Sequence, residues 1–154
     1  MNSEKEIRDK VKGALELIGE QYGSDLGIDK NYIDNVLERA DKGKIERIPD
    51  DGVYSVYRAD YCLFTQIFMP PEGQRKMLIG DYTATTKGDV YIIGRSGLDE
   101  TYFRIDGNNV KKRTCNKNNA PLYISRVQVA VVPEENELEV INLGKNPIEI
   151  KKLF

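Results

Sequence analysis

Two arginines stand beside hydroxyl side chains at the ends of apolar stretches in this sequence. Arg95 lies between Gly94 and Ser96 at the end of one apolar run, and Ser125 and Arg126 lie in a later one. A phosphate that leaves water needs several strong hydrogen-bond donors at one point, and guanidinium and hydroxyl groups are such donors. Because sites are commonly built where strands end in loops, this pattern indicates an anion-binding site.

The sequence contains no histidine, which excludes several kinds of active site and metal site. Ser-His-Asp triads, Cys-His dyads and imidazole zinc sites all need that side chain. The only cysteines, Cys62 and Cys115, lack the paired spacing of a zinc site or a disulfide scaffold, so we expect ordinary thiols of a reducing compartment. Acidic pairs such as Asp50-Asp51 stand in turns, and no Gly-rich phosphate loop is present. We therefore expect a protein that is not an enzyme and that uses neither a metal nor a cofactor.

Positive and negative charges are nearly balanced, with 23 basic and 25 acidic residues and a net charge of −2. Such a chain has no overall field that attracts nucleic acid or an acidic membrane. The basic run Lys111–Arg113 is short and its aromatic neighbours precede it by several residues, so nucleic acid is not the expected partner. The N-terminus is charged without an apolar core, and no stretch is long enough to cross a membrane. We expect a cytoplasmic protein with no membrane partner.

The beginning of the chain is expected to form two helices. The first covers residues 3–22, where Ser3 and Glu6 have the spacing of a capping box and apolar residues recur at helical intervals. The second covers residues 30–42. We interpret the pair as a helical hairpin within an N-terminal extension, residues 1–48. The hairpin either packs on the rest of the protein or serves as an arm for dimerisation or partner docking.

From residue 53 onward, helical periodicity gives way to short apolar and β-branched runs. The expected strands are residues 53–57, 62–69, 77–85, 90–95, 124–132, 138–141 and 148–150, with hairpin turns at Thr86–Asp89 and Asp106–Asn109. Most of residues 97–121 is expected to be a long polar loop, with a flexible basic tip that includes Lys111–Arg113. This alternation of short strands and turns predicts a mainly β protein, with a β-sandwich domain over residues 53–154.

The order of the motifs within this strand pattern resembles that of the forkhead-associated (FHA) domain. Gly94–Ser96 comes first, Ser125-Arg126 follows, and Asn142–Pro147 is the last. The resemblance covers roughly residues 59–154. Gln128 stands where that family has a histidine that braces its site from within, and Pro147 stands where the family has glycine.

The resemblance implies an FHA-like β-sandwich with a phosphopeptide-binding site formed by Arg95, Ser125, Arg126 and Asn146. Arg95 would hold the phosphate, and Ser125 would donate its hydroxyl to a phosphate oxygen. A second cation would come from Arg126 or from Lys111–Arg113, and Asn146 would hydrogen-bond the main chain of the ligand.

Two functions remain open on this basis. The first is a phosphothreonine-binding module that mediates protein–protein interaction in signalling, with a phosphorylated protein as its partner. The second is a degenerate FHA-like scaffold or assembly subunit that binds its partners independently of phosphorylation, which the departures at Gln128 and Pro147 and the long polar loop favour. Either protein could oligomerise through the N-terminal helices.

Overall fold

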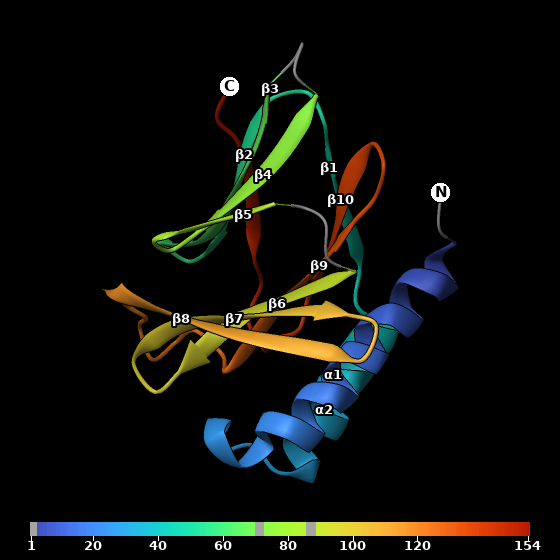
Figure 1. Cartoon of the computed structure of the whole chain (residues 1–154), viewed down its shortest axis with the longest axis vertical. Coiled ribbons are helices and arrows are strands. Elements are labelled where there is room, and N and C mark those ends of the chain that lie inside the picture. Colours follow the sequence, from blue (N-terminus) through green and yellow to red (C-terminus); the bar gives the residue numbers. More distant parts are fainter. Residues whose placement is uncertain (1–2, 70–72, 86–88) are drawn as a thin grey trace.

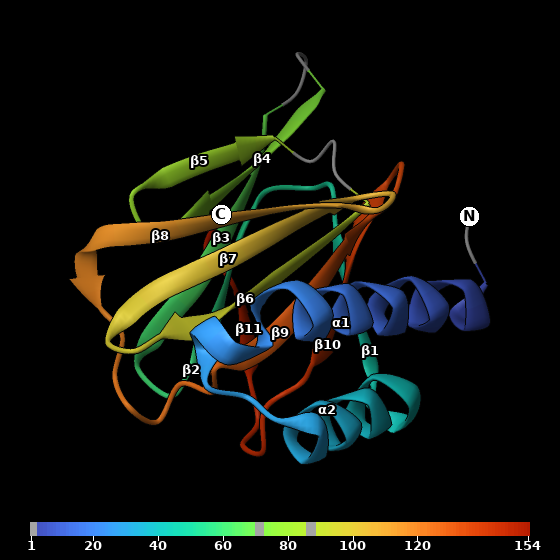
Figure 2. The same ribbon diagram turned by 60° about the horizontal axis from the view of Figure 1, so that its bottom comes forward.

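Two N-terminal helices and two antiparallel sheets form three layers (Figures 1 and 2). The structure is a computed structural model that describes residues 3–69, 73–85 and 89–154, with the side chains of residues 85 and 116–119 left aside. The helices lie on one face of a six-stranded sheet, and the opposite face of that sheet packs against a five-stranded sheet. The predicted mainly β class with two N-terminal helices is confirmed.

The helical layer consists of α1 (Glu4–Leu26) and α2 (Lys30–Lys42). The Ser3 half of the predicted capping box is present, since the Ser3 side chain accepts a hydrogen bond from the backbone N–H of Glu6 at 3.2 Å. The Glu6 carboxylate accepts from the Ser3 hydroxyl at 3.2 Å. The predicted end of the first helix at residue 22 is wrong. The helix continues to Leu26, which is buried, and the left-handed conformation that ends it is adopted by Gly27 at φ 66°.

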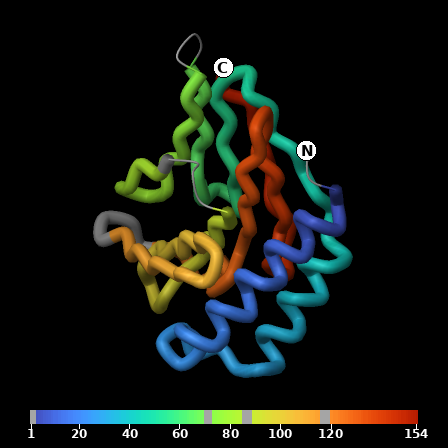
Figure 3. The backbone as a smooth tube through the Cα atoms, turned by 45° about the vertical axis from the view of Figure 1, so that its right-hand side comes forward, coloured from blue at the N-terminus to red at the C-terminus, as the bar shows by residue number. Residues whose placement is uncertain are grey.

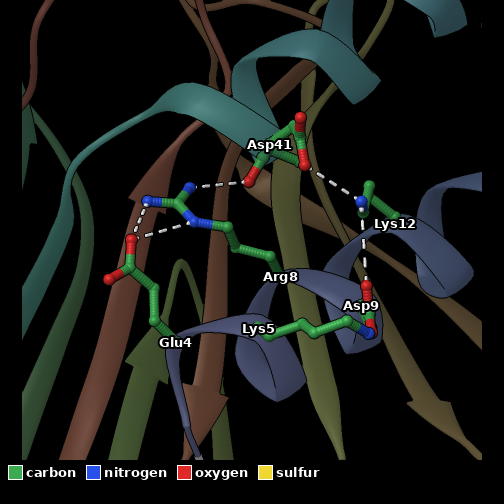
Figure 4. Close-up of polar contacts among 7 residues, drawn as sticks. Glu4, Lys5, Arg8, Asp9, Lys12 and Asp41 are labelled. Carbon is green, nitrogen blue, oxygen red and sulfur yellow. Dashed lines mark hydrogen bonds and ion pairs between the residues drawn. The ribbon is translucent and has the colours of Figure 1, made fainter.

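The helical hairpin shares a hydrophobic core with the six-stranded sheet. Ile7, Val11 and Leu15 of α1 are fully buried in it together with Val36 of α2. Polar contacts join the exposed side of the two helices (Figure 4): Lys12 Nζ lies 3.0 Å from Asp41, and Arg8 donates to the backbone carbonyl of Ala40 at 2.9 Å. Exposed pairs of this kind add little stability, so burial of the apolar face holds the hairpin in place.

Over the described residues the two sheets comprise eleven strands, and all neighbouring strands are antiparallel. The six-stranded sheet contains β1 (Ile45–Pro49), β10 (Glu137–Asn142), β9 (Val127–Pro133), β6 (Val90–Ser96), β7 (Asp99–Asp106) and β8 (Asn109–Asn119), in that order. The five-stranded sheet contains β11 (Glu149–Lys152), β2 (Val53–Arg58), β3 (Tyr61–Met69), β4 (Gln74–Ile79) and β5 (Tyr82–Thr85), in that order.

Strand β6 lies inside the six-stranded sheet and is buried on both faces. Val90 and Ile92 belong to the core beneath the helices, whereas Tyr91 and Ile93 belong to the core between the sheets. A strand covered on both sides needs apolar residues at every position, which explains the continuous apolar run of this segment.

Two predicted segments differ in the structure. Residues 45–49, assigned to the helical extension, form β1, which pairs with β10. Much of the expected polar loop 97–121 is the β7–β8 hairpin, whose Phe103 and Ile105 are buried beneath the helices. The outer strand of this hairpin is a sheet edge, where exposed polar side chains are common, and this gives the segment its loop-like composition.

Two strand boundaries were also predicted incorrectly. Residues 77–85 are divided by a turn at Gly80, which has φ 58°, into β4 and β5. The strand expected from residue 124 begins at Val127. The hairpin turn expected at Thr86–Asp89 falls mostly on residues 86–88, which lie outside the described residues. The strands on either side, β5 and β6, belong to different sheets.

Candidate functional site

Three segments meet at one end of the six-stranded sheet, because β6 and β10 end where β9 begins. We call this region the loop end and define it as residues 94–98, 120–126 and 142–148. The backbone N–H of Arg95 donates to the carbonyl of Arg126 at 3.2 Å. The segments approach so closely that a Cβ at Gly94 would lie 2.0 Å from that carbonyl oxygen, so only glycine fits. The glycine before Arg95 therefore brings the first two loops together.

The guanidinium of Arg95 is held by backbone carbonyls and not by carboxylates. Its Nε donates to the carbonyl of Ile124, and its Nη1 donates to the carbonyl of Gly97 at 3.0 Å. Among the described residues, Arg95 has no ion-pair partner. The side chain is therefore fixed in orientation while its positive charge and its other N–H groups remain available to an anion.

Ser125 is joined to the third loop through the buried side chain of Gln128. The Ser125 backbone N–H donates to Gln128 Oε1 at 2.9 Å, and Gln128 Nε2 donates to Asn142 Oδ1 at 2.9 Å. The Asn142 side chain then donates to the carbonyl of Asn146 at 2.8 Å. This chain of hydrogen bonds fixes the loop of Ser125 relative to the loop of Asn146.

The polar side chains at the ends of this chain of hydrogen bonds are left unengaged. The Ser125 hydroxyl has no hydrogen-bond partner within the described part of the chain, and the same holds for the carboxamide of Asn146, which is exposed. The structure thus brings Arg95 and Ser125 to adjoining positions and anchors the backbone of Asn146 to the same network.

Arg126 is placed differently from the other predicted site residues. Its Nη1 donates to the carbonyl of Gly27 at 2.6 Å, and its guanidinium carbon lies 5.9 Å from the centre of the Tyr32 ring. The Tyr32 hydroxyl in turn accepts a hydrogen bond from the backbone N–H of Val127 at 3.1 Å. Arg126 therefore fastens the helical hairpin to the sheet. Lys111–Arg113 is also not part of the loop end, because it lies on β8 opposite Tyr102–Arg104.

Sequence reasoning missed several residues beside the loop end. Leu98, Leu122 and Tyr123 are exposed apolar side chains, and Leu122 is 71% exposed. The guanidinium carbon of Arg58, at the end of β2, lies 5.4 Å from the centre of the Tyr123 ring, and the Tyr123 hydroxyl donates to Asp60. A second cation near this loop is therefore Arg58. The sequence feature that could have revealed this apolar surface is the pair Leu122-Tyr123 within a polar stretch.

Two titratable groups lie at the neighbouring β7–β8 hairpin, the partly buried Tyr61 and the buried Cys115 of β8. Tyr61 donates its hydroxyl to Glu100, and burial together with this carboxylate raises the pKa of Tyr61. Burial raises the pKa of the Cys115 thiol to about 12. Both groups stay protonated near neutral pH, and a protonated thiol is a poor nucleophile.

No model of a known protein family matches this chain, and no curated protein or solved structure is significantly similar to it. The resemblance to the FHA domain therefore stays a prediction. Within residues 3–69, 73–85 and 89–154, no group of three or more Cys, Asp or Glu side chains is placed to bind a metal ion. Neither helix of that part of the chain is long and apolar enough to span a bilayer.

Proposed function

We propose that this protein is an FHA-like module that binds a phosphothreonine-containing partner at the loop end and so mediates protein–protein interaction. The observation that carries the proposal is the adjacency of Arg95 and Ser125, whose side chains both keep free hydrogen-bond donors. A third group, the exposed carboxamide of Asn146, belongs to a loop tied to the same network.

A phosphate at this place would gain a charge-assisted hydrogen bond from Arg95 and a second hydrogen bond from Ser125. Charge-assisted bonds are roughly twice as strong as neutral ones, and a fixed guanidinium loses little entropy when it binds. An unphosphorylated threonine offers no charge to Arg95 and would bind more weakly. The exposed Leu98, Leu122 and Tyr123 supply apolar area for the residues that flank the phosphothreonine.

This arrangement serves recognition without turnover. Nothing in the proposed contacts requires a bond to form or break, since Arg95 and Ser125 act only as hydrogen-bond donors. We place the interaction in the cytoplasm, where thiols such as Cys62 and Cys115 stay reduced.

Fluorescence anisotropy with a pool of labelled phosphothreonine peptides tests the proposal. The phosphothreonine pool should bind at least about tenfold more tightly than the matched phosphoserine and unphosphorylated pools, a difference of about 1.4 kcal/mol or more. Ser125→Ala should lose most of this preference without a change in thermal stability, because its hydroxyl has no hydrogen-bond partner among the described residues. Arg95→Ala should abolish the preference.

Arg95→Lys and Lys151→Ala serve as controls for this experiment. Arg95→Lys keeps the charge but not the bonds to two carbonyls, so it separates charge from geometry. Lys151 is an exposed cation on β11, at the edge of the other sheet, and its removal should change nothing. Equal binding of all three peptide pools to the wild-type protein would end the proposal.

The second candidate is a degenerate FHA-like scaffold that binds an unphosphorylated partner. It is favoured by the apolar exposure of Leu98, Leu122 and Tyr123, which needs no phosphate to act as a docking surface. A partner that is retained by the Arg95→Ala, Ser125→Ala double variant but lost by Leu122→Asp would favour this candidate over the first.

A further inference from the structure

The edge strands of the two sheets, β5 and β8, lie near each other (Figures 2 and 3). A small cavity is lined by residues of both sheets at this place. The edges approach each other here, because the guanidinium carbon of Arg113 lies 5.6 Å from the centre of the Tyr82 ring. The cavity has a volume of about 190 Å³, and its lining includes Thr83, Tyr102, Arg104, Lys111 and Arg113. We call it the edge cavity.

The charges that line the edge cavity are mostly positive. Arg104 and Lys111 stand directly opposite each other on β7 and β8, where two like charges repel. Arg104 Nε is paired with Asp106 at 2.9 Å, but Lys111 and Arg113 have no acidic partner among the described residues. Within the described part of the chain, these three cations therefore make one ion pair with a carboxylate, and the lining of the cavity keeps an excess of positive charge.

Neutral donors accompany these cations. Tyr102 is largely buried, and burial raises the pKa of its hydroxyl although Arg113 lowers it, so the phenol stays protonated. Thr83 of β5 contributes to the lining from the other sheet. An anion in the cavity would thus meet ammonium and guanidinium donors from β7 and β8 together with the Tyr102 hydroxyl.

We propose that the edge cavity binds a small dianion of the size of phosphate. Such a ligand would neutralise Lys111 and Arg113 and relieve their repulsion with Arg104. The volume of about 190 Å³ lies below the range of roughly 300–1,000 Å³ that drug-sized ligands need, which favours a compact ion over a nucleotide or peptide.

The edge cavity is separate from the loop end. In the strand register Arg95 of β6 lies opposite Glu100 of β7, and Arg104 lies four residues further along β7, or roughly 13 Å at the usual rise per residue. Variants at the two places therefore report on the two proposals independently.

Titration of the full chain with inorganic phosphate, followed by backbone amide NMR and calorimetry, tests this site. We expect saturable binding that shifts the amides of Lys111 and Arg113, with sulfate able to compete. Lys111→Gln and Arg113→Gln should each weaken phosphate binding at least about tenfold. Without phosphate, Lys111→Gln should not lower the melting temperature, since it removes a repulsion and no bond.

Further measurements distinguish free phosphate from a phosphorylated metabolite as the ligand, and they locate the binding site. Glycerol 3-phosphate that binds more tightly than phosphate would assign the site to a phosphorylated metabolite, and the reverse order would assign it to free phosphate. Lys151→Gln should bind phosphate at the edge cavity like the wild type, with the same shifts of the Lys111 and Arg113 amides. No saturable shift on β8, or unchanged phosphate binding by both β8 variants, would overturn the proposal.

Discussion

A Cβ atom at Gly144 would lie only 2.2 Å from Nε2 of Gln128. The loop after β10 therefore packs directly against the buried side-chain amide of Gln128. The backbone N–H of Gly144 also donates to the backbone carbonyl of Gln128 at 3.2 Å. The oxygen of the Gln128 side-chain amide, Oε1, accepts a hydrogen bond from the backbone N–H of Ser125. Gln128 is the residue through which two loops of the loop end are held in one arrangement.

Gln128→Ala should lower the free energy of unfolding by about 2–4 kcal/mol. The change leaves the Ser125 N–H without its acceptor, removes a donor to Asn142 and opens a cavity, and each loss is costly in a buried place. Urea denaturation measures the effect. Gln74→Ala, at an exposed position of β4, is the matched control and should stay within about 0.5 kcal/mol of the wild type. Similar stability of the two variants would mean that Gln128 does not brace the loops.

Gly94→Ala and Gly13→Ala should have opposite effects on stability. At Gly94 the added methyl would lie 2.0 Å from the carbonyl oxygen of Arg126, a backbone atom that cannot move without separating β6 from the loop of Ser125. We expect a loss of about 2 kcal/mol or more. At Gly13 nothing lies within 4 Å of the added methyl, and alanine in an exposed helix position should stabilise by roughly 0.5–1 kcal/mol. Thermal melts of both variants check the pair, and a harmless Gly94→Ala would contradict the close approach.

Glu139→Gln should remove a pH dependence of stability. Burial raises the pKa of Glu139, Arg47 at 3.4 Å lowers it, and the nearby Glu137 raises it further, with a net increase above the ordinary 4.5. The folded protein then holds this proton more tightly than the unfolded chain does. Stability therefore falls as pH rises from about 4.5 through the raised pKa, and it stays lower above that value.

The glutamine variant should accordingly match the wild type in acid and exceed it in stability near neutral pH. Urea unfolding over a series of pH values measures the difference between the two curves. Glu149→Gln, on the exposed edge strand β11, should give a curve parallel to that of the wild type. A parallel curve for Glu139→Gln as well would show that this carboxylate keeps its ordinary pKa in the fold.

Local patterns determined much of the fold. Some sequence patterns reflect what a single helix or strand needs, so they predict that element without the tertiary structure. Examples are the cap at Ser3, the helical apolar spacing of α1 and α2, and the continuous apolar run of β6. The β7–β8 hairpin could not be read in this way. Its outer strand is polar because it lies at a sheet edge, and only sheet order reveals which strand is an edge.

The residues of the candidate site likewise fall into those that the sequence indicated and those that only the tertiary structure revealed. Gly94, Arg95 and Ser125 were found from residue type and order along the chain. The direction of Arg126 toward Tyr32 of the helical hairpin, the place of Arg58 beside the loop end and the cations of the edge cavity depend on contacts between residues far apart in the chain. Sequence determined which chemical groups this protein has at its strand ends. The packing of the helices and of the second sheet decided which of those groups face one another, because burial and close approach select among side-chain directions that are equally allowed locally.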